Sequence, residues 1–275
     1  MTLPEKLEQL QALLRQSGRT LVAYSGGVDS ALLMKVAHDT LGVKSLAVIA
    51  DTPSLPRREL VEALELAKQF GFAVRMIQTE EMSDAKYASN PPNRCYFCKS
   101  ELFKKMVALA KVEGWQTIVY GENADDAGDF RPGAQAAAEF CVRAPLKEAG
   151  LTKAEVRVLS TQFGLPTAEK PPMACLSSRI PYGETVTPDV LAMVEAAENV
   201  LRDRGFRDVR VRHHRNLARI EVGVPEMFRW TEPGLCAVVC EELKRIGYTY
   251  VTLDLQGYRQ GSVNEVLATM KKVEP

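Results

Sequence analysis

The sequence lacks the features that would assign it to a charged or membrane-embedded class. Its 35 basic and 35 acidic residues cancel at pH 7, a balance that does not favour nucleic acid or an anionic membrane as a partner. No apolar run approaches the roughly 18 residues that a membrane-spanning helix needs. The N-terminal stretch 4–18 mixes charged residues with leucines and predicts an amphipathic helix, not a signal peptide. We therefore expect a cytoplasmic protein without a membrane partner.

Common nucleotide and metal signatures are missing as well. The chain contains neither G-x-x-x-x-G-K-[ST] nor G-x-G-x-x-G, which excludes a Walker A loop and a dinucleotide fingerprint. A C-x-x-C occurs only once, and His213 and His214 lack the spacing of zinc ligands. We interpret the two histidines as an exposed strand edge. Among only six cysteines, we interpret Cys141, Cys236 and Cys240 as small core residues.

A glycine-rich turn is the most informative segment that is present. It reads Ser25-Gly26-Gly27-Val28-Asp29-Ser30 and lies between an apolar run and a helix-like run. Two glycines allow the backbone to approach a bulky anion, and the start of a helix offers free N–H groups. The turn therefore predicts a phosphate site, with an ordinary helix cap as the alternative.

The first half of the chain alternates between strand and helix patterns. This alternation predicts an α/β fold, a doubly wound parallel sheet covered on both faces. The predicted strands are 20–24, 45–50, 73–78 and 117–120, and the predicted helices are 31–40, 58–70 and 97–112. Thr152 begins a capping box and predicts one more helix.

The second half has a different pattern and predicts a separate domain. Five prolines in 165–188 argue against regular structure there. Beyond them we expect helices over 189–204 and 233–246, and strands over 208–213, 218–222 and 250–255, which make a small α+β domain. The predicted organisation is a nucleotide-binding domain at 1–170, an interdomain loop at 171–188 and a C-terminal domain at 189–275.

Polar segments follow three of the predicted parallel strands. Ligands of such sheets bind beyond the carboxyl ends of the strands, so the glycine turn, Asp51 and the loop Gly121–Asp126 should meet at one crevice. In that loop Asn123, Asp125 and Asp126 supply the hard oxygen atoms that Mg²⁺ prefers. An Asx turn or a helix cap is an equally good interpretation of the loop.

Three cysteines carry potential chemistry. The C-x-x-C of Cys95 and Cys98 is typical of a redox pair, half a zinc site or part of an iron–sulfur site. Cys175 lies between prolines, and the positive charge of Arg179 nearby would favour its thiolate. A buried loop cysteine is the alternative.

Four motifs together resemble one known family. SGGVDS resembles the pyrophosphate loop of the AMP-forming ATP pyrophosphatases, the PP-loop superfamily. With G-x-N-x-D-D, P-x-x-A-C-L-x-S-R and R-V-R…A-R-I-E-V, nearly the whole chain resembles the LarE family. The resemblance implies an adenine nucleotide α-hydrolase-like sheet. It also implies an enzyme that uses ATP and Mg²⁺ to adenylylate a carboxylate of pyridinium-3,5-biscarboxylic acid mononucleotide and then installs sulfur, in nickel-pincer nucleotide biosynthesis.

The resemblance also implies roles for individual residues. Pyrophosphate and metal would be held by Ser25, Gly26, Gly27, Asp29 and Ser30, with help from Asp125 and Asp126. Cys175 is the sulfur-bearing position, and it is consumed in the sacrificial members, which lack the C-x-x-C. This chain has a C-x-x-C, so the resemblance implies a [4Fe–4S] cluster on Cys95, Cys98 and Cys175 that carries an extra sulfide.

The C-terminal domain is expected to bind the nucleotide substrate. Arginine side chains bind phosphate and carboxylate groups through paired hydrogen bonds. The candidate substrate residues are Arg179, Arg210, Arg212, Glu221 and Arg259, although a solvated basic strand is an alternative for the arginines. We expect a homo-oligomer. The alternatives are sacrificial sulfur donation from Cys175 within the same reaction, a tRNA-thiolating PP-loop enzyme and a non-catalytic nucleotide sensor.

Overall fold

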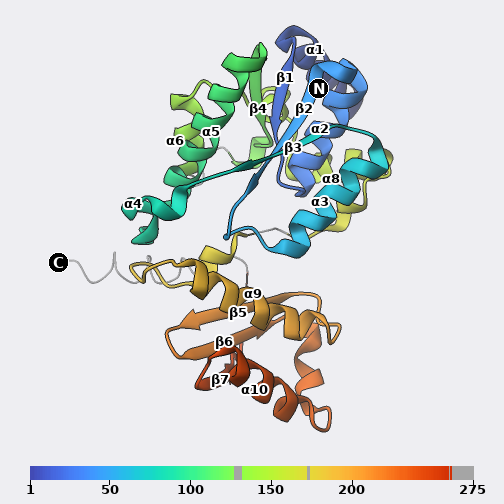
Figure 1. Cartoon of the computed structure of the whole chain (residues 1–275). Helices are drawn as coiled ribbons and strands as arrows, with labels where there is room; N and C mark the ends of the chain where they lie inside the picture. Colours follow the sequence, from blue (N-terminus) through green and yellow to red (C-terminus); the bar gives the residue numbers. More distant parts are fainter. Residues whose placement is uncertain (127–131, 172–173, 260, 262–275) are drawn as a thin grey trace, which may run out of the picture. The chain divides into compact units, whose positions relative to one another are not determined.

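A computed structural model describes residues 1–126, 132–171, 174–259 and 261, which form two compact units (Figure 1). The first unit comprises the described residues of Met1–Tyr87 and Pro92–Met173. The second comprises those of Ala88–Pro91 and Ala174–Pro275. Cys175 therefore belongs to the second unit. No helix in the described ranges is both long and apolar enough to cross a membrane.

The first unit contains a parallel sheet of four strands, which confirms the predicted fold class. The strands are β1 (Thr20–Ala23), β2 (Ser45–Asp51), β3 (Val74–Gln78) and β4 (Thr117–Tyr120). Their order is β3-β2-β1-β4, and every neighbouring pair is parallel. The chain thus builds outward from β1 to β3 and then returns to the other side of β1. Ligands in open α/β sheets bind at such a switch point, here between β1 and β4.

Helices cover both faces of this sheet (Figure 1). Side chains alternate along β1, so Val22 packs into one core and Leu21 into the other. The first core receives α1 (Leu3–Ser17), α2 (Val28–Leu41), α3 (Arg57–Phe70), α7 (Pro145–Glu148) and α8 (Lys153–Gln162). The second receives α5 (Arg94–Glu113) and α6 (Pro132–Glu139), and α4 (Ala85–Ala88) is a single turn.

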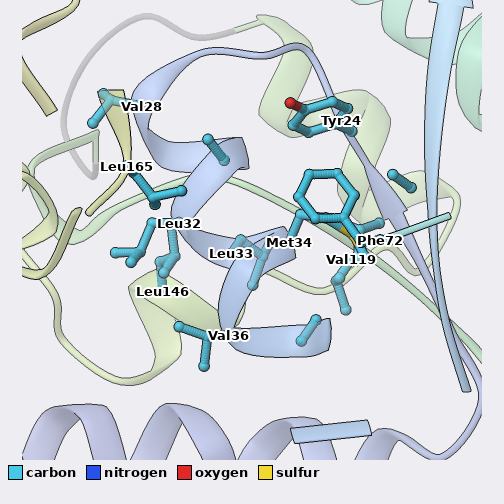
Figure 2. Close-up of a cluster of buried hydrophobic side chains, with 14 of the residues drawn as sticks. Tyr24, Val28, Leu32, Leu33, Met34, Val36, Phe72, Val119, Leu146 and Leu165 are labelled. Atoms are coloured by element: carbon cyan, nitrogen blue, oxygen red, sulfur yellow. The ribbon is translucent and has the colours of Figure 1, made fainter. Parts of the chain in front are cut away.

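The first core fixes the end of β1, where the glycine turn begins (Figure 2). Tyr24 packs edge-on against Phe72, with ring centroids 5.5 Å apart, and its hydroxyl donates a hydrogen bond to the carbonyl oxygen of Ala63 at 3.0 Å. Burial raises the pKa of the Tyr24 hydroxyl well above its ordinary value, so it stays a neutral donor. The turn therefore starts from an anchored residue.

The second unit contains a small mixed sheet with helices, as the predicted fold class requires, and it begins earlier in the chain than the predicted 189–275. Its elements are α9 (Pro188–Arg202), β5 (Val209–His214), β6 (Leu217–Val222), α10 (Leu235–Ile246) and β7 (Tyr250–Leu253). The strand order is β5-β6-β7, with β5 antiparallel and β7 parallel to β6. The described residues of the proline-rich stretch, expected to be irregular, contain two short 3₁₀ turns, η4 (Pro166–Glu169) and η5 (Leu176–Arg179).

Several interpretations of cysteine and histidine were wrong. Cys141 and Cys236 are exposed and Cys240 is only half-buried. Cys141 occupies a left-handed turn after α6, with φ +55°, where an apolar neighbourhood in sequence does not imply burial. His213 is buried and its Nδ1 atom lies 3.2 Å from the Tyr248 hydroxyl, so it is not exposed, although β5 is an edge strand of the described sheet.

Candidate functional site

The glycine turn has a shape that only glycine can adopt at its tightest point. Gly26 has φ +72°, and a Cβ atom at this position would lie 2.6 Å from the Cβ of Ala63 on α3. Gly27 is the residue that precedes the first turn of α2. The N–H groups of that first turn have no partners within the helix, which makes them suitable for a phosphate.

Two serines brace the turn. The hydroxyl of Ser30 donates to the carbonyl oxygen of Gly27 at 3.1 Å and accepts from the backbone N–H of Ser25 at 3.2 Å. Ser30 is buried, whereas Ser25 is exposed, with its hydroxyl 3.1 Å from that of Ser30. The turn is therefore ordered by its own hydrogen bonds and presents Ser25 at the surface.

Asp29 joins three segments at the switch point. Its Oδ1 atom accepts a hydrogen bond from Asn123 Nδ2 at 3.1 Å, and its Oδ2 atom pairs with Lys153 Nζ at 2.5 Å. The loop after β4 also passes close to α2, because a Cβ on Gly121 would lie 2.8 Å from the backbone nitrogen of Ser30. The predicted meeting of the glycine turn with the loop 121–126 is thus observed.

Lys153 was missed in the sequence. It is the first residue of α8, directly after the capping Thr152, whose side chain accepts from Glu155 N. A lysine in this position is an unremarkable helix residue in sequence. Only the return of the chain to the switch point brings its ammonium group to Asp29.

The carboxylates of Asp125 and Asp126 in the loop 121–126 accept hydrogen bonds from backbone N–H groups. Asn123 Oδ1 accepts from the N–H of Asp125 at 3.0 Å, which is an Asx turn, and Asp126 Oδ2 accepts from the N–H of Asn123 at 3.1 Å. Asp125 Oδ2 accepts from the N–H of Lys153 at 2.8 Å. These bonds order the loop, and Asp29 is the carboxylate that lies within the glycine turn itself.

Asp51, the third predicted segment, contacts its own neighbours. Its carboxylate pairs with Arg57 at 2.5 Å and accepts a hydrogen bond from Gln78 Nε2 at 2.7 Å. The hydrogen bond from Arg57 holds the pKa of the Asp51 carboxyl below its ordinary value. Asp51 therefore connects the end of β2 with the start of α3 and with β3.

Asp29 fits a magnesium ion that is held together with phosphates. Mg²⁺ usually takes one or two protein carboxylates and keeps water and phosphate oxygen atoms as its other ligands. Across the ranges that the structure describes, no group of three or more His, Cys, Asp or Glu residues forms a metal cage. The single carboxylate of Asp29 in the glycine turn therefore agrees with a magnesium ion whose other ligands are water and phosphate oxygen atoms.

Arg179 in the second unit holds the backbone around Cys175. Its Nη1 atom donates to the carbonyl oxygen atoms of Ala174 at 2.7 Å and Cys175 at 3.0 Å. Its Nε and Nη2 atoms donate to the carboxylate of Glu198 at 2.8 and 3.1 Å. We refer to residues 174–179 as the Cys175 loop, in which the Cys175 side chain is half-buried.

Glu198 was also missed in the sequence, although a signal was present. It lies on the apolar face of α9, between the buried residues Val194 and Leu201. Burial alone would raise the pKa of its carboxyl, but the charge and hydrogen bonds of Arg179 outweigh burial and hold that pKa below its ordinary value. Its Oε1 atom also accepts from the N–H of Val211 on the edge strand β5, at 3.1 Å.

Arg212 and Glu221 form a second buried pair, on one face of the small sheet. Arg212 donates to both carboxylate oxygen atoms, at 3.0 and 2.8 Å, and to the carbonyl oxygen of Ser178 at 3.0 Å. Arg210 stacks on the ring of Tyr258, with Cζ 4.8 Å from the ring centroid. Both arginines are less than 10% exposed, so the solvated-strand interpretation was wrong.

The remaining predicted residues are distributed over both units. Arg259 Nη1 lies 4.0 Å from Asp254 Oδ1. Cys95, exposed, and Cys98, half-buried, lie at the start of α5 in the first unit. A cluster that these two cysteines share with Cys175 of the second unit stays a prediction.

Comparison with known proteins finds relatives that match nearly the whole chain. No family model matches the sequence. An uncharacterized protein of Synechocystis is 45% identical over 265 residues, which cover 96% of this chain and 99% of that protein. The pyridinium-3,5-bisthiocarboxylic acid mononucleotide synthase of Lactiplantibacillus plantarum is 37% identical over 267 residues, covering 97% and 96%.

A more distant relative matches in part. The tRNA-specific 2-thiouridylase MnmA of Geobacter metallireducens is 28% identical over 193 residues, which cover 55% of this chain and 52% of that enzyme. Partial matches of this kind are expected of the wider PP-loop superfamily, whereas the alignment with the Lactiplantibacillus synthase covers 96% of that enzyme. The chain therefore belongs to the LarE family of pyridinium-3,5-bisthiocarboxylic acid mononucleotide synthases.

Proposed function

We propose that the chain is an AMP-forming, ATP-dependent sulfurtransferase of nickel-pincer nucleotide biosynthesis. Its substrate is pyridinium-3,5-biscarboxylic acid mononucleotide, of which it converts a carboxylate to a thiocarboxylate. The observation that carries this proposal is the alignment with the Lactiplantibacillus synthase over 97% of the chain. The ordered phosphate turn at Gly26 supports it.

The first step activates the carboxylate, which is otherwise a poor electrophile because its leaving group would be oxide. A carboxylate oxygen attacks the α-phosphorus of ATP, and pyrophosphate leaves with the electron pair of the broken P–O bond. The N–H groups at the start of α2 and the Ser25 hydroxyl bind that pyrophosphate. Mg²⁺, when bound at Asp29, supplies neutralisation of the phosphate charge.

Lys153 supports the same step. Its ammonium group lies 2.5 Å from Asp29, at the edge of the phosphate turn. Positive charge at that point offsets the charge of Asp29 and favours an incoming triphosphate. We assign Lys153 to the nucleotide site together with Ser25, Gly26, Gly27, Asp29 and Ser30; Asp51, Gly121, Asn123, Asp125 and Asp126 complete the proposed set.

In the second step a sulfur nucleophile attacks the acyl carbon, and AMP leaves. If the Cys175 thiolate is the nucleophile, a thioester forms first. Loss of a proton from Cα and cleavage of the Cβ–Sγ bond then release the thiocarboxylate and leave dehydroalanine. Alternatively, Cys95, Cys98 and Cys175 would hold an iron–sulfur cluster, and an added sulfide bound there would be the nucleophile. We favour the second source, because the chain has the C-x-x-C that sacrificial members lack.

We propose that residues of the second unit bind the mononucleotide substrate. Arg210 and Arg212 lie on the same face of β5, because side chains two apart along a strand point the same way. Guanidinium groups are suited to the phosphate and carboxylates of this substrate. We propose that Arg210, Arg212, Glu221 and Arg259 contribute, and that Arg179 contributes by holding the Cys175 loop.

The test is a complete reaction with anaerobically purified protein, MgATP, sulfide and the dicarboxylate mononucleotide. We expect pyrophosphate and AMP, together with a product in which mass spectrometry finds sulfur in place of oxygen. The matched control substrate is the same mononucleotide with both carboxylates replaced by amides, which should release no pyrophosphate. ATP cleavage without sulfur in the product would contradict the proposal. Thiolation of tRNA, with no thiolation of the mononucleotide, would favour a tRNA-thiolating PP-loop enzyme.

A further inference from the structure

A short segment before α5 is bound to the second unit. Residues Ala88–Pro91 belong to that unit, although the chain on either side belongs to the first. Asn90 is fully buried and has φ +55°. Its side-chain Nδ2 atom donates hydrogen bonds to the carbonyl oxygen atoms of Ile180 at 3.2 Å and Pro181 at 2.7 Å.

Two backbone hydrogen bonds extend this contact. The N–H of Gly183 donates to the carbonyl oxygen of Asn90 at 3.0 Å, and the N–H of Val186 donates to that of Ala88 at 2.8 Å. We call these four hydrogen bonds the Asn90 clasp. They bind the stretch 180–186, which directly follows the Cys175 loop.

The clasp completes the restraint of the Cys175 loop. Arg179, at the end of the loop, is anchored to Glu198, and its Nη1 atom holds the carbonyl groups of Ala174 and Cys175. The very next residue, Ile180, accepts from Asn90. We propose that Asn90 is a positioning residue for Cys175; its importance for sulfur transfer rests on the proposed function, but the restraint itself does not.

The chemistry of asparagine accounts for its presence here. Asparagine tolerates the left-handed backbone better than most residues, and its amide supplies two donors. Aspartate has the same shape and the same backbone tolerance, but its carboxylate would face two carbonyl oxygen atoms with no proton to donate. Glycine keeps the backbone conformation and removes the side chain altogether.

Alkylation of Cys175 tests the restraint directly. The full-length Asn90→Asp variant is treated with iodoacetamide, and peptide mass spectrometry compares the labelling rates of Cys175 and of the exposed Cys236 in the same molecule. Loss of two buried hydrogen bonds favours local opening, so we expect the Cys175 rate relative to Cys236 to rise at least about threefold. An unchanged ratio in the folded variant would overturn the proposal.

Two further variants make the result interpretable. Asn216→Asp makes the same chemical change at an exposed position between β5 and β6, and its labelling ratio should equal that of the wild type. If Asn90→Asp does not fold, as judged by circular dichroism, Asn90→Gly replaces it. A labelling ratio at the wild-type value in folded Asn90→Gly would equally refute the role of the side chain.

Kinetic measurements distinguish a failure of the Asn90 restraint hypothesis from a failure of the proposed function. If Asn90 restrains the Cys175 loop and the proposed function is right, Asn90→Asp lowers kcat for thiocarboxylate formation. The KM for ATP stays unchanged, because the ATP site lies in the first unit. If the proposed function is wrong, neither protein forms thiocarboxylate, yet the labelling ratio still changes. A fall in kcat with an unchanged labelling ratio would contradict the restraint of Cys175 by Asn90 but not the proposed function.

Discussion

Arg179 and Glu198 form a buried ion pair with two hydrogen bonds, at 2.8 and 3.1 Å, and their side chains are only 2% and 4% exposed. The same guanidinium group holds the backbone of Ala174 and Cys175. A charge pair inside the second unit thus sets the conformation of the loop that carries the proposed sulfur-bearing residue.

Replacing Glu198 with glutamine should destabilise the second unit strongly. The substitution leaves the Arg179 guanidinium buried without its counter-charge, which typically costs about 3–5 kcal/mol. Urea unfolding followed by circular dichroism measures the loss. Glu241→Gln breaks the exposed pair with Arg245 on α10 and should cost at most about 1 kcal/mol. Similar losses in the two variants would contradict the importance of burial.

Acid should weaken the same pair. The pKa of the Glu198 carboxyl is lower in the folded protein than its ordinary value of 4.5. Its contribution to the free energy of unfolding is therefore fully present above pH 4.5 and is lost as the pH falls through the lower, folded-state pKa. Unfolding free energies measured from pH 7 down to pH 3 should decline less steeply in Glu198→Gln than in the wild type. Equal slopes would argue against the pair.

Two glycine-to-alanine variants separate backbone strain from a clash in the phosphate turn. Gly26 and Gly71 have φ values of +72° and +73°, but only a Cβ on Gly26 meets another atom, at 2.6 Å from Ala63. Each variant should lose about 1–2 kcal/mol of stability from backbone strain. Only Gly26→Ala should lose ATP binding, measured by calorimetry, because its turn must shift. Normal ATP affinity in that variant would exclude the turn as the phosphate site.

Removing the charge of Lys153 should weaken ATP binding. In Lys153→Met the Asp29 carboxylate loses its cationic partner, so the phosphate turn becomes more negative and repels the triphosphate. A hydrogen-bonded charge of this kind is worth about 1.5–3 kcal/mol, and we expect the Kd for MgATP to rise by a factor on the order of 10 or more. Lys153→Arg keeps the charge and should bind nearly normally. Equal affinities in both variants would show that the charge is irrelevant.

The source of sulfur is decided by two cysteine variants. Cys175→Ser should still release pyrophosphate with the dicarboxylate substrate but should form no thiocarboxylate. Cys95→Ser should lose iron and multiple turnover, because we expect about four irons per chain in anaerobically reconstituted wild type. An iron-free, colourless wild type would contradict the cluster. A used wild-type chain lighter by one hydrogen sulfide would then identify Cys175 as the donor.

Local patterns in the sequence determined most of the fold. Periodicity located the four parallel strands, and the capping box at Thr152 located the start of α8, because these features depend on neighbours along the chain. The glycine turn was also identifiable, since a positive φ at Gly26 is a local requirement. Family motifs then indicated the chemistry.

The tertiary structure alone decided which residues meet. Lys153 and Asp29 are 124 positions apart, and they pair because β4 returns beside β1. Glu198 reaches Arg179 because its helix lies along the edge strand β5. Cys141 and His213 were misjudged for the same reason: burial depends on what packs against a residue, and short-range periodicity carries no record of such distant neighbours.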